Sequence, residues 1–187
     1  FTGSDVTTDG FEAGYKTEID KMISTVCVDQ DGVLWIGTNG GDINVFSKGK
    51  RVAIYGADDG DLNGNPVQAS LCDTKGNLWF GLFNGGLCYY NRTQKYFRQV
   101  FSKDKALIDV RAIYEDDHHT IWIGTSEGVY KAGLDGQLFW EHYIENEQVR
   151  CLFKDEQGFL WVGTFGGGVV KFDISDSMYS RVRQDFG

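Results

Sequence analysis

Four segments of the sequence repeat one pattern, and this repetition limits the possible folds more than any other feature. Each segment holds an extended apolar run, a short acidic turn and a second run centred on tryptophan, and together they cover residues 23–38, 67–82, 110–125 and 149–164. Their landmark tryptophans are separated by 44, 43 and 39 residues, namely Trp35, Trp79, Trp122 and Trp161. One four-stranded propeller blade occupies roughly 40 to 50 residues. The period therefore predicts an all-β fold of β-propeller-type blades, built as four four-stranded antiparallel repeats.

Within each repeat, the strands can be assigned from side-chain alternation and turn residues. The first strand carries a small residue at its middle on the face that we expect to be buried, as the crowded innermost strand of a blade requires. A turn with glycine follows, then the tryptophan strand, a third strand, and an outer strand near 51–55, 96–101, 138–144 or 179–184. The predicted units are blade 1 at 23–66, blade 2 at 67–109, blade 3 at 110–148 and blade 4 at 149–187. We interpret residues 1–22 as an N-terminal segment that supplies the outer strand of a preceding blade.

The composition excludes several classes of function. The formal charge is -9 and the pI is about 4.7, and no compact Lys/Arg patch offsets this charge locally. The net field repels polyanions, so nucleic acid and anionic membrane are not expected as partners. The apolar stretches extend over only a few residues, which is too short for a bilayer span by this segment.

Cysteine and histidine positions do not indicate a redox or metal site. The four cysteines lie among apolar neighbours in predicted strands, and we expect all of them to be buried free thiols. His118 and His119 follow two aspartates, but adjacent residues of a turn point apart, so a solvated turn is favoured over a metal site. The acidic stretch 58–65 does not complete an EF-hand calcium loop. We expect no cofactor and no bound metal.

The repeat resembles the two-component regulator propeller repeat. The pattern Asp-x-x-Gly-x-Leu-Trp-Ile-Gly-Thr-x-x-Gly-Gly is seen best at 29–41 and 155–168, and four copies cover nearly the whole chain. Leu82 departs from it, standing where the pattern has threonine. Proteins of this type carry extracytoplasmic propellers ahead of a membrane span and a histidine kinase, often in hybrid two-component sensors of polysaccharide-foraging bacteria. The resemblance implies a periplasmic sensor domain for carbohydrate, part of a ring of about seven blades.

A four-blade piece of such a ring raises the question of its partners. Each blade buries a face against its neighbour, so a partial ring leaves two apolar faces uncovered. We therefore expect either missing flanking blades or self-association of the chain.

Candidate binding residues lie in the loops between the second and third strands. One variable position follows each tryptophan by four residues, and variable loops on a fixed scaffold are where recognition is usually found. The phenylalanines there are candidates for stacking on a sugar ring, and the polar residues for bonding its hydroxyls, although ordinary loop packing explains them as well. The candidate ligand-binding residues are Asn39, Phe83, Asn84, Ser126, Glu127 and Phe165. The repeated tryptophans are expected to fill the space between blades instead.

Three classes of function remain open from the sequence. The leading hypothesis is a ligand-sensing propeller of a bacterial two-component sensor, with a small molecule or oligosaccharide as ligand. A protein-interaction scaffold is the alternative. A propeller enzyme of lyase or glycosidase type is the third, but catalytic triads, P-loops and Cys-x-x-Cys motifs are absent from the sequence. We predict no catalytic residues in this region.

Overall fold

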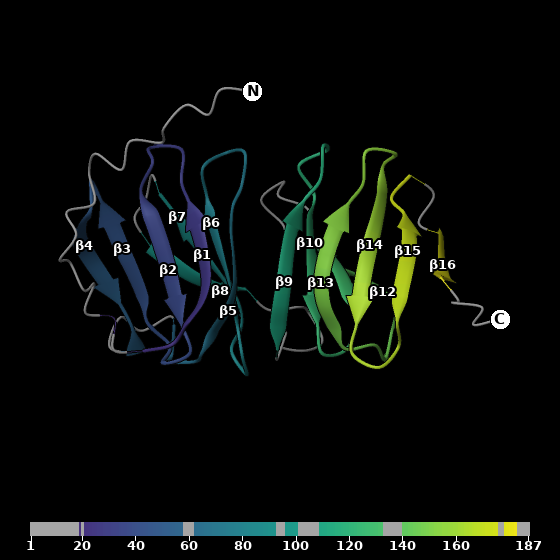
Figure 1. Ribbon diagram of the computed structural model, residues 1–187, viewed down its shortest axis with the longest axis horizontal. Helices are drawn as coiled ribbons and strands as arrows, with labels where there is room; N and C mark the ends of the chain where they lie inside the picture. Colours follow the sequence, from purple (N-terminus) through teal and green to yellow (C-terminus); the bar gives the residue numbers. More distant parts are fainter. Residues whose placement is uncertain are drawn as a thin grey trace, which may run out of the picture.

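The computed structural model describes residues 19, 21–57, 62–92, 96–100, 109–132, 140–175 and 178–182. Its sixteen strands form four separate sheets, and in each sheet neighbouring strands pair antiparallel in chain order. Figure 1 shows the four sheets side by side in a row, with β1–β4 at one end and β13–β16 at the other. The predicted all-β fold of four four-stranded blades is confirmed. Among the described residues, no helix has the length and hydropathy needed to cross a bilayer.

Each blade is an antiparallel meander of four strands. Blade 1 contains β1 (Ile23–Val28), β2 (Leu34–Thr38), β3 (Ile43–Ser47) and β4 (Lys50–Tyr55), and blade 2 contains β5 (Val67–Cys72), β6 (Leu78–Leu82), β7 (Gly86–Asn91) and β8 (Tyr96–Val100). Blade 3 contains β9 (Val110–Glu115), β10 (Ile121–Thr125), β11 (Val129–Ala132) and β12 (Trp140–Tyr143), and blade 4 contains β13 (Val149–Lys154), β14 (Phe159–Thr164), β15 (Val169–Asp173) and β16 (Met178–Val182). The expected N-terminal strand lies almost wholly outside the described residues.

The hydrophobic core consists of three layers, one between each pair of adjacent blades. In every layer the tryptophan face of one blade packs against the opposite, apolar face of the next. Trp79, for example, packs with Ile121 and Ile123 of blade 3, and all three side chains are buried. Burial of an aromatic ring of this size is one of the largest contributions a single residue makes to folding. Because each layer needs two blades, a single blade has no core of its own.

A glycine two residues after the tryptophan, within the same strand, allows the next blade to approach closely in blades 1 to 3. A Cβ placed on Gly37 would lie 2.6 Å from the side chain of Val67, the first residue of the following blade. Gly81 and Val110 repeat this contact at 2.6 Å, and the third layer does so with the equivalent pair. The first strand of each blade therefore packs directly on the backbone of its neighbour.

The two end faces of the row are apolar and partly exposed. On blade 1 the outward face carries Val26 and Ile54, which are 57% and 50% exposed, although Ile36 on the same face is buried. On blade 4 the uncovered tryptophan face carries Phe153, which is 65% exposed, and the half-buried Trp161. The sequence predicted one buried face for every first strand. That prediction holds for blades 2 and 3 but is wrong for Ile23, which is 49% exposed, and for Phe153, because the tryptophan face of blade 4 lies at the end of the described row.

Candidate functional site

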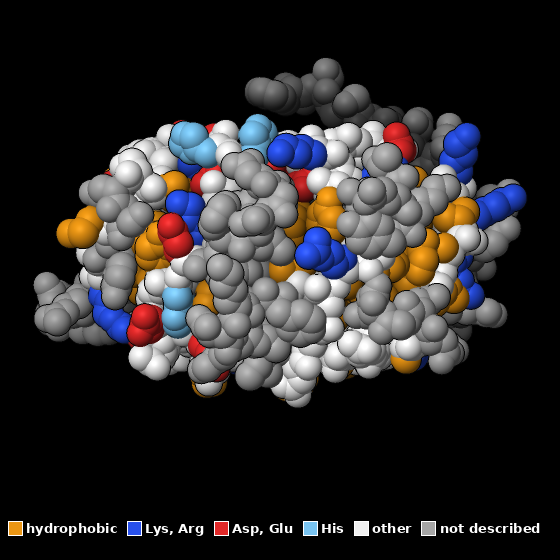
Figure 2. All heavy atoms as spheres, turned by 180° about the vertical axis from the view of Figure 1, so that it is seen from behind, with side chains coloured by type: hydrophobic (Ala, Val, Ile, Leu, Met, Phe, Trp, Pro, Cys, Tyr) orange, Lys and Arg blue, Asp and Glu red, His pale blue; other side chains and the backbone are white. Residues whose placement is uncertain are grey.

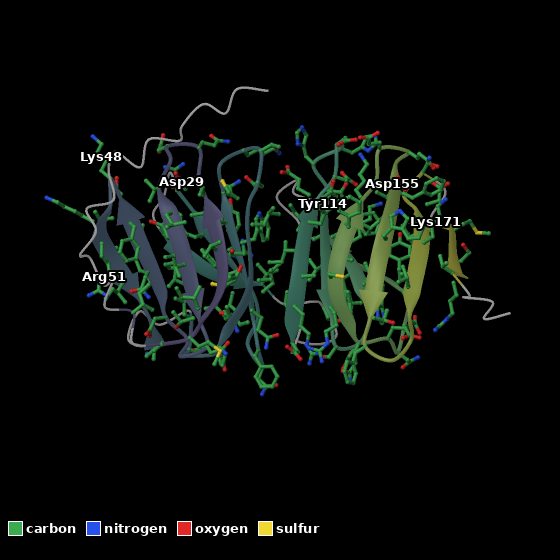
Figure 3. All side chains as sticks on the ribbon, in the orientation of Figure 1. Asp29, Lys48, Arg51, Tyr114, Asp155 and Lys171 are labelled. Atoms are coloured by element: carbon green, nitrogen blue, oxygen red, sulfur yellow. The ribbon has the colours of Figure 1, made fainter. Side chains whose placement is uncertain are left out.

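The loops form two opposite rims of the row of blades. We call the first the loop rim, which consists of the loops 38–42, 82–86, 125–128 and 164–168 with the residues that precede each first strand. We call the second the hairpin rim, which consists of the turns 29–33, 73–77, 116–120 and 155–159. Asp29 and Asp155 are labelled in Figure 3 and mark the hairpin rim at the upper edge of that view.

On the loop rim, one backbone hydrogen bond recurs in all four blades and fixes the predicted binding positions. The residue four positions after each tryptophan donates its N–H to the carbonyl of the residue just before the first strand. The bonds join Asn39 to Met22 (2.9 Å), Phe83 to Pro66 (2.8 Å), Ser126 to Asp109 (3.1 Å) and Phe165 to Gln148 (2.8 Å). Since these bonds use only backbone atoms, the side chains are free to vary without disturbing the scaffold.

The candidate side chains differ in how far they reach solvent. Phe165 is 67% exposed and Phe83 is 37% exposed, while Asn39 and Asn84 are exposed and Ser126 and Glu127 are half-buried. The guanidinium of Arg150 lies 4.8 Å from the ring centroid of Phe165. A β-bridge joins Phe83 to Asp109 and so links the loop of blade 2 to blade 3. All six candidates lie on one rim, and their role in binding stays a prediction.

The sequence reading missed a second set of loop-rim residues, which sit on β-bulges. The register of each first strand shifts by one residue at Ser24, Gln68, Arg111 and Arg150. A bulge re-aims the side chain of its extra residue. A bulge leaves the length of the repeat unchanged, so nothing in the repeat pattern indicated these positions.

The Arg111 bulge forms a buried ion pair with Asp109. Arg111 Nε donates to Asp109 Oδ2 at 2.9 Å, and Asp109 is 4% exposed. Asp109 Oδ1 and Arg111 Nη1 have no hydrogen-bond partner although both are buried. A buried ion pair of this kind fixes local geometry more than it adds stability.

On the hairpin rim, each turn is closed by an aspartate that also binds the tryptophan of its own blade. In blade 2, Asp73 Oδ1 accepts from the N–H of Asn77 at 2.7 Å, and Oδ2 accepts from Trp79 Nε1 at 3.0 Å. The same bond to indole recurs in the other blades at 2.9, 2.9 and 2.7 Å. The indole bond to Trp161 lowers the pKa of Asp155 below its ordinary value. The bond to indole was not predicted from the sequence.

The histidine pair lies in a turn, as expected. His119 occupies the position of the turn glycine with φ of +62°, and its Nδ1 lies 2.7 Å from Thr74 Oγ1 of the preceding blade. No group of three or more His, Cys, Asp or Glu side chains within the described ranges is placed to hold a metal ion. Half of the acidic stretch 58–65, including Asp58, Asp59 and Asp61, lies outside those ranges.

The cysteines are all free, but not all are buried. Cys88 is buried, Cys27 and Cys72 are half-buried, and Cys151 is exposed. The expectation of burial is wrong for Cys151, because it lies on the uncovered tryptophan face of blade 4. Burial raises the pKa of the Cys27 thiol to about 11.

Four segments of the chain match the sequence profile of the family described as two component regulator propeller, at residues 17–40, 61–84, 107–127 and 143–166. Each segment contains the acidic turn and the tryptophan strand of one blade. No curated protein sequence matches the chain.

Similar solved structures include two extracellular domains from B. thetaiotaomicron. The extracellular domain of a putative hybrid two component system is 44% identical with a TM-score of 0.76, and the match covers 86% of this chain and 22% of that one. The extracellular domain of a putative one component system is 22% identical with a TM-score of 0.71, and the match covers 86% of this chain and 23% of that one. Virginiamycin B lyase from Staphylococcus aureus, at 15% identity, has a TM-score of 0.68 with 88% and 56% covered, and this likeness concerns the fold alone. The chain spans about a fifth of the two extracellular domains.

Proposed function

The chain belongs to the two component regulator propeller family, and on that premise we propose that it senses an extracellular ligand, a carbohydrate, for a two-component system. The proposal is supported by 44% identity to an extracellular domain of a putative hybrid two component system. This chain spans only 22% of that domain. The proposal therefore extends to the whole protein, for which it includes a periplasmic location, an inner-membrane parent and a histidine kinase in the parent chain.

The loop rim carries this proposal. Phe83 and Phe165 present exposed rings at equivalent positions of two blades, and rings of this kind stack on the C–H faces of sugars. Asn39, Asn84 and Ser126 add amide and hydroxyl groups that match sugar hydroxyls. The repeated backbone bond ties Asn39, Phe83, Ser126 and Phe165 to the start of the first strand of a blade, which supports the precise placement that recognition requires.

The test is binding of oligosaccharides, by glycan array and then by calorimetry. Replacement of both Phe83 and Phe165 by alanine is expected to weaken sugar binding about tenfold or more. The comparable stacking of a nucleic-acid base on an aromatic side chain contributes about 1–3 kcal/mol per base. Phe153→Ala is the matched control, because Phe153 is equally exposed but lies on the open face of blade 4. Absence of binding to any oligosaccharide would contradict the proposal.

The exposed end faces favour a second candidate function, a protein-interaction scaffold. Apolar faces of this kind usually mark contact with another protein surface. A partner captured equally well by the wild type and by the double Phe83/Phe165 variant would favour this function over ligand sensing. Turnover of a lactone or a glycoside that survives extensive purification would instead favour an enzyme.

We also propose that the end faces are covered by flanking blades or by a second copy of the chain. The three internal layers all pair a tryptophan face with the opposite apolar face of the next blade, and the two end faces present one of each kind. A head-to-tail contact would therefore repeat the internal packing. Sedimentation of the wild type against Phe153→Asp tests the second-copy version, which predicts a loss of oligomer in the variant. A wild type that is monomeric at every concentration would leave flanking blades as the occupant.

A further inference from the structure

An open cleft of about 580 Å³ lies on the hairpin rim between blades 3 and 4. Its walls are the turns 116–120 and 155–159, the turn after β15, and Lys131 of β11. In Figure 2, histidine side chains stand at the upper edge of the molecule, which is this rim. The volume falls within the range of about 300 to 1,000 Å³ that is typical of small-molecule sites. The cleft is on the rim opposite to the six predicted binding residues.

The repeat itself explains why the rim is open at this junction. Between blades 1 and 2, Arg92 follows β7 and reaches back to the turn of blade 1, where it binds Asp31 and lies 3.6 Å from Asp29 Oδ2. The equivalent residue after β15 is Ile174, because Leu78 pairs with Tyr90 as Leu160 pairs with Phe172. An isoleucine makes no such bridge.

The turn of blade 3 has changed at the matching position. His118 stands where blade 1 has Asp31, so the carboxylate that binds the arginine is absent together with the arginine itself. At the junction of blades 1 and 2 the bridging pair occupies the space, and at the junction of blades 3 and 4 that space is the cleft. With Ile174 in place of the arginine and His118 in place of the aspartate, this junction lacks the ion pair and has a concave surface instead.

Polar side chains line the cleft and remain available for a ligand. The imidazole of His118, the hydroxyl of Thr120 and the amide of Gln157 make no side-chain hydrogen bond within the residues described for this chain. Together they offer donors and acceptors from both walls, while Ile174 adds apolar surface.

The charges in the cleft nearly cancel. Lys154 of blade 4 forms an ion pair with Asp117 of blade 3 across the junction. Lys131 lies 3.6 Å from Glu141. The other two carboxylates that line the cleft accept hydrogen bonds, Asp116 from the indole of Trp122 and Asp173 from the amide and hydroxyl of Ser175. Three carboxylates face two ammonium groups, so the lining carries a small negative excess, which together with the net charge of -9 disfavours acidic ligands.

From this geometry we infer that the cleft between blades 3 and 4 binds a small neutral polyhydroxylated molecule, of mono- or disaccharide size. Its hydroxyls bond to His118, Thr120 and Gln157. The inference shares the ligand class of the proposed sensing function but assigns it a different surface, so the two fail separately.

The experiment is a titration of the ¹⁵N-labelled 187-residue chain with glucose, galactose, maltose and lactose as probes, followed by amide chemical shifts. The expected result is a saturable shift for at least one probe, confined to the turns 116–120, 155–159 and the segment 173–175. Ile174→Arg places the blade 2 bridging residue in the cleft and is expected to weaken that binding about tenfold or more. Glucuronate, an acidic probe, is expected to bind more weakly than the neutral sugars.

A second variant and a control keep the test independent of folding. The paired change Thr120→Val with Gln157→Ala removes two hydrogen-bonding side chains from the surface of the cleft, and it is expected to weaken binding as well. Val52→Ala, an exposed position on β4 of blade 1, is expected to leave it unchanged. Shifts confined to the loop rim and abolished by Phe165→Ala would overturn this inference while supporting the proposed function. Absence of shifts with all neutral probes at millimolar concentration would also overturn it.

Discussion

Replacing Asp73 by alanine tests whether the aspartate–indole bond holds each blade together. The Asp73 carboxylate accepts from the N–H of Asn77, from Asn77 Nδ2 at 3.1 Å and from Trp79 Nε1. Asp73 is 2% exposed and Trp79 is 1% exposed, so water does not replace the lost acceptor. A buried donor left without a partner costs about 1–3 kcal/mol, and the bonds lost from the turn amide add about 1 kcal/mol. We expect the free energy of unfolding to fall by about 3 kcal/mol.

The measurement is urea unfolding followed by tryptophan fluorescence, with Asp155→Ala as the matched comparison. Asp155 accepts the equivalent bonds from a turn amide and from Trp161 in blade 4, although Phe159 cannot supply the side-chain bond that Asn77 makes. Trp161 is half-buried on the uncovered face, so water can accept its indole N–H. The loss for Asp155→Ala should therefore be clearly smaller. Trp79→Phe in the Asp73→Ala background removes the orphaned donor and should recover part of the loss, giving a coupling energy of about 1 kcal/mol or more. Equal losses for the two aspartates would refute the reasoning, because burial would then not set the cost.

Three further predictions follow from the same geometry. Gly81→Ala places a Cβ 2.6 Å from Val110 Cγ1 and 2.7 Å from the Val110 carbonyl oxygen, so thermal unfolding should show that the free energy of unfolding falls by about 1–3 kcal/mol. Gly163→Ala should cause a smaller loss, because its Cβ would meet only the exposed Cys151 of its own blade within 3 Å. The folded-state pKa values of Asp117 and Asp155 lie below their ordinary value of 3.8. The stability that these carboxylates contribute is therefore present above about pH 4 and is lost as the pH falls through the folded-state pKa. A free energy of unfolding that stays constant from pH 5 to pH 2 would contradict this. Cys151 should react with a thiol reagent at pH 8 before Cys27, whose burial raises its pKa to about 11, and mass spectrometry of the labelled peptides identifies which thiol reacts first.

The loop-rim residues show how far sequence reasoning reached into the candidate site. The position four residues after each tryptophan was identifiable because the repeats align without a gap, and alignment fixes equivalent positions in space. The bulged residues, such as Arg111, were missed because a bulge changes the pairing of strands without changing the length of the repeat. The cleft between blades 3 and 4 was also missed. It depends on Ile174 and His118, which belong to different blades and meet only across a junction.

The sequence by itself determined the number of blades, the strand order and the role of the tryptophans, because these follow from local alternation and from a period that every repeat obeys. The tertiary structure alone decided which faces are buried. Phe153 and Leu71 occupy equivalent positions in their repeats, yet Phe153 is exposed and Leu71 is packed against the following blade. Burial of a blade face depends on the neighbour that covers it, and a residue pattern within one repeat carries no information about whether that neighbour is there.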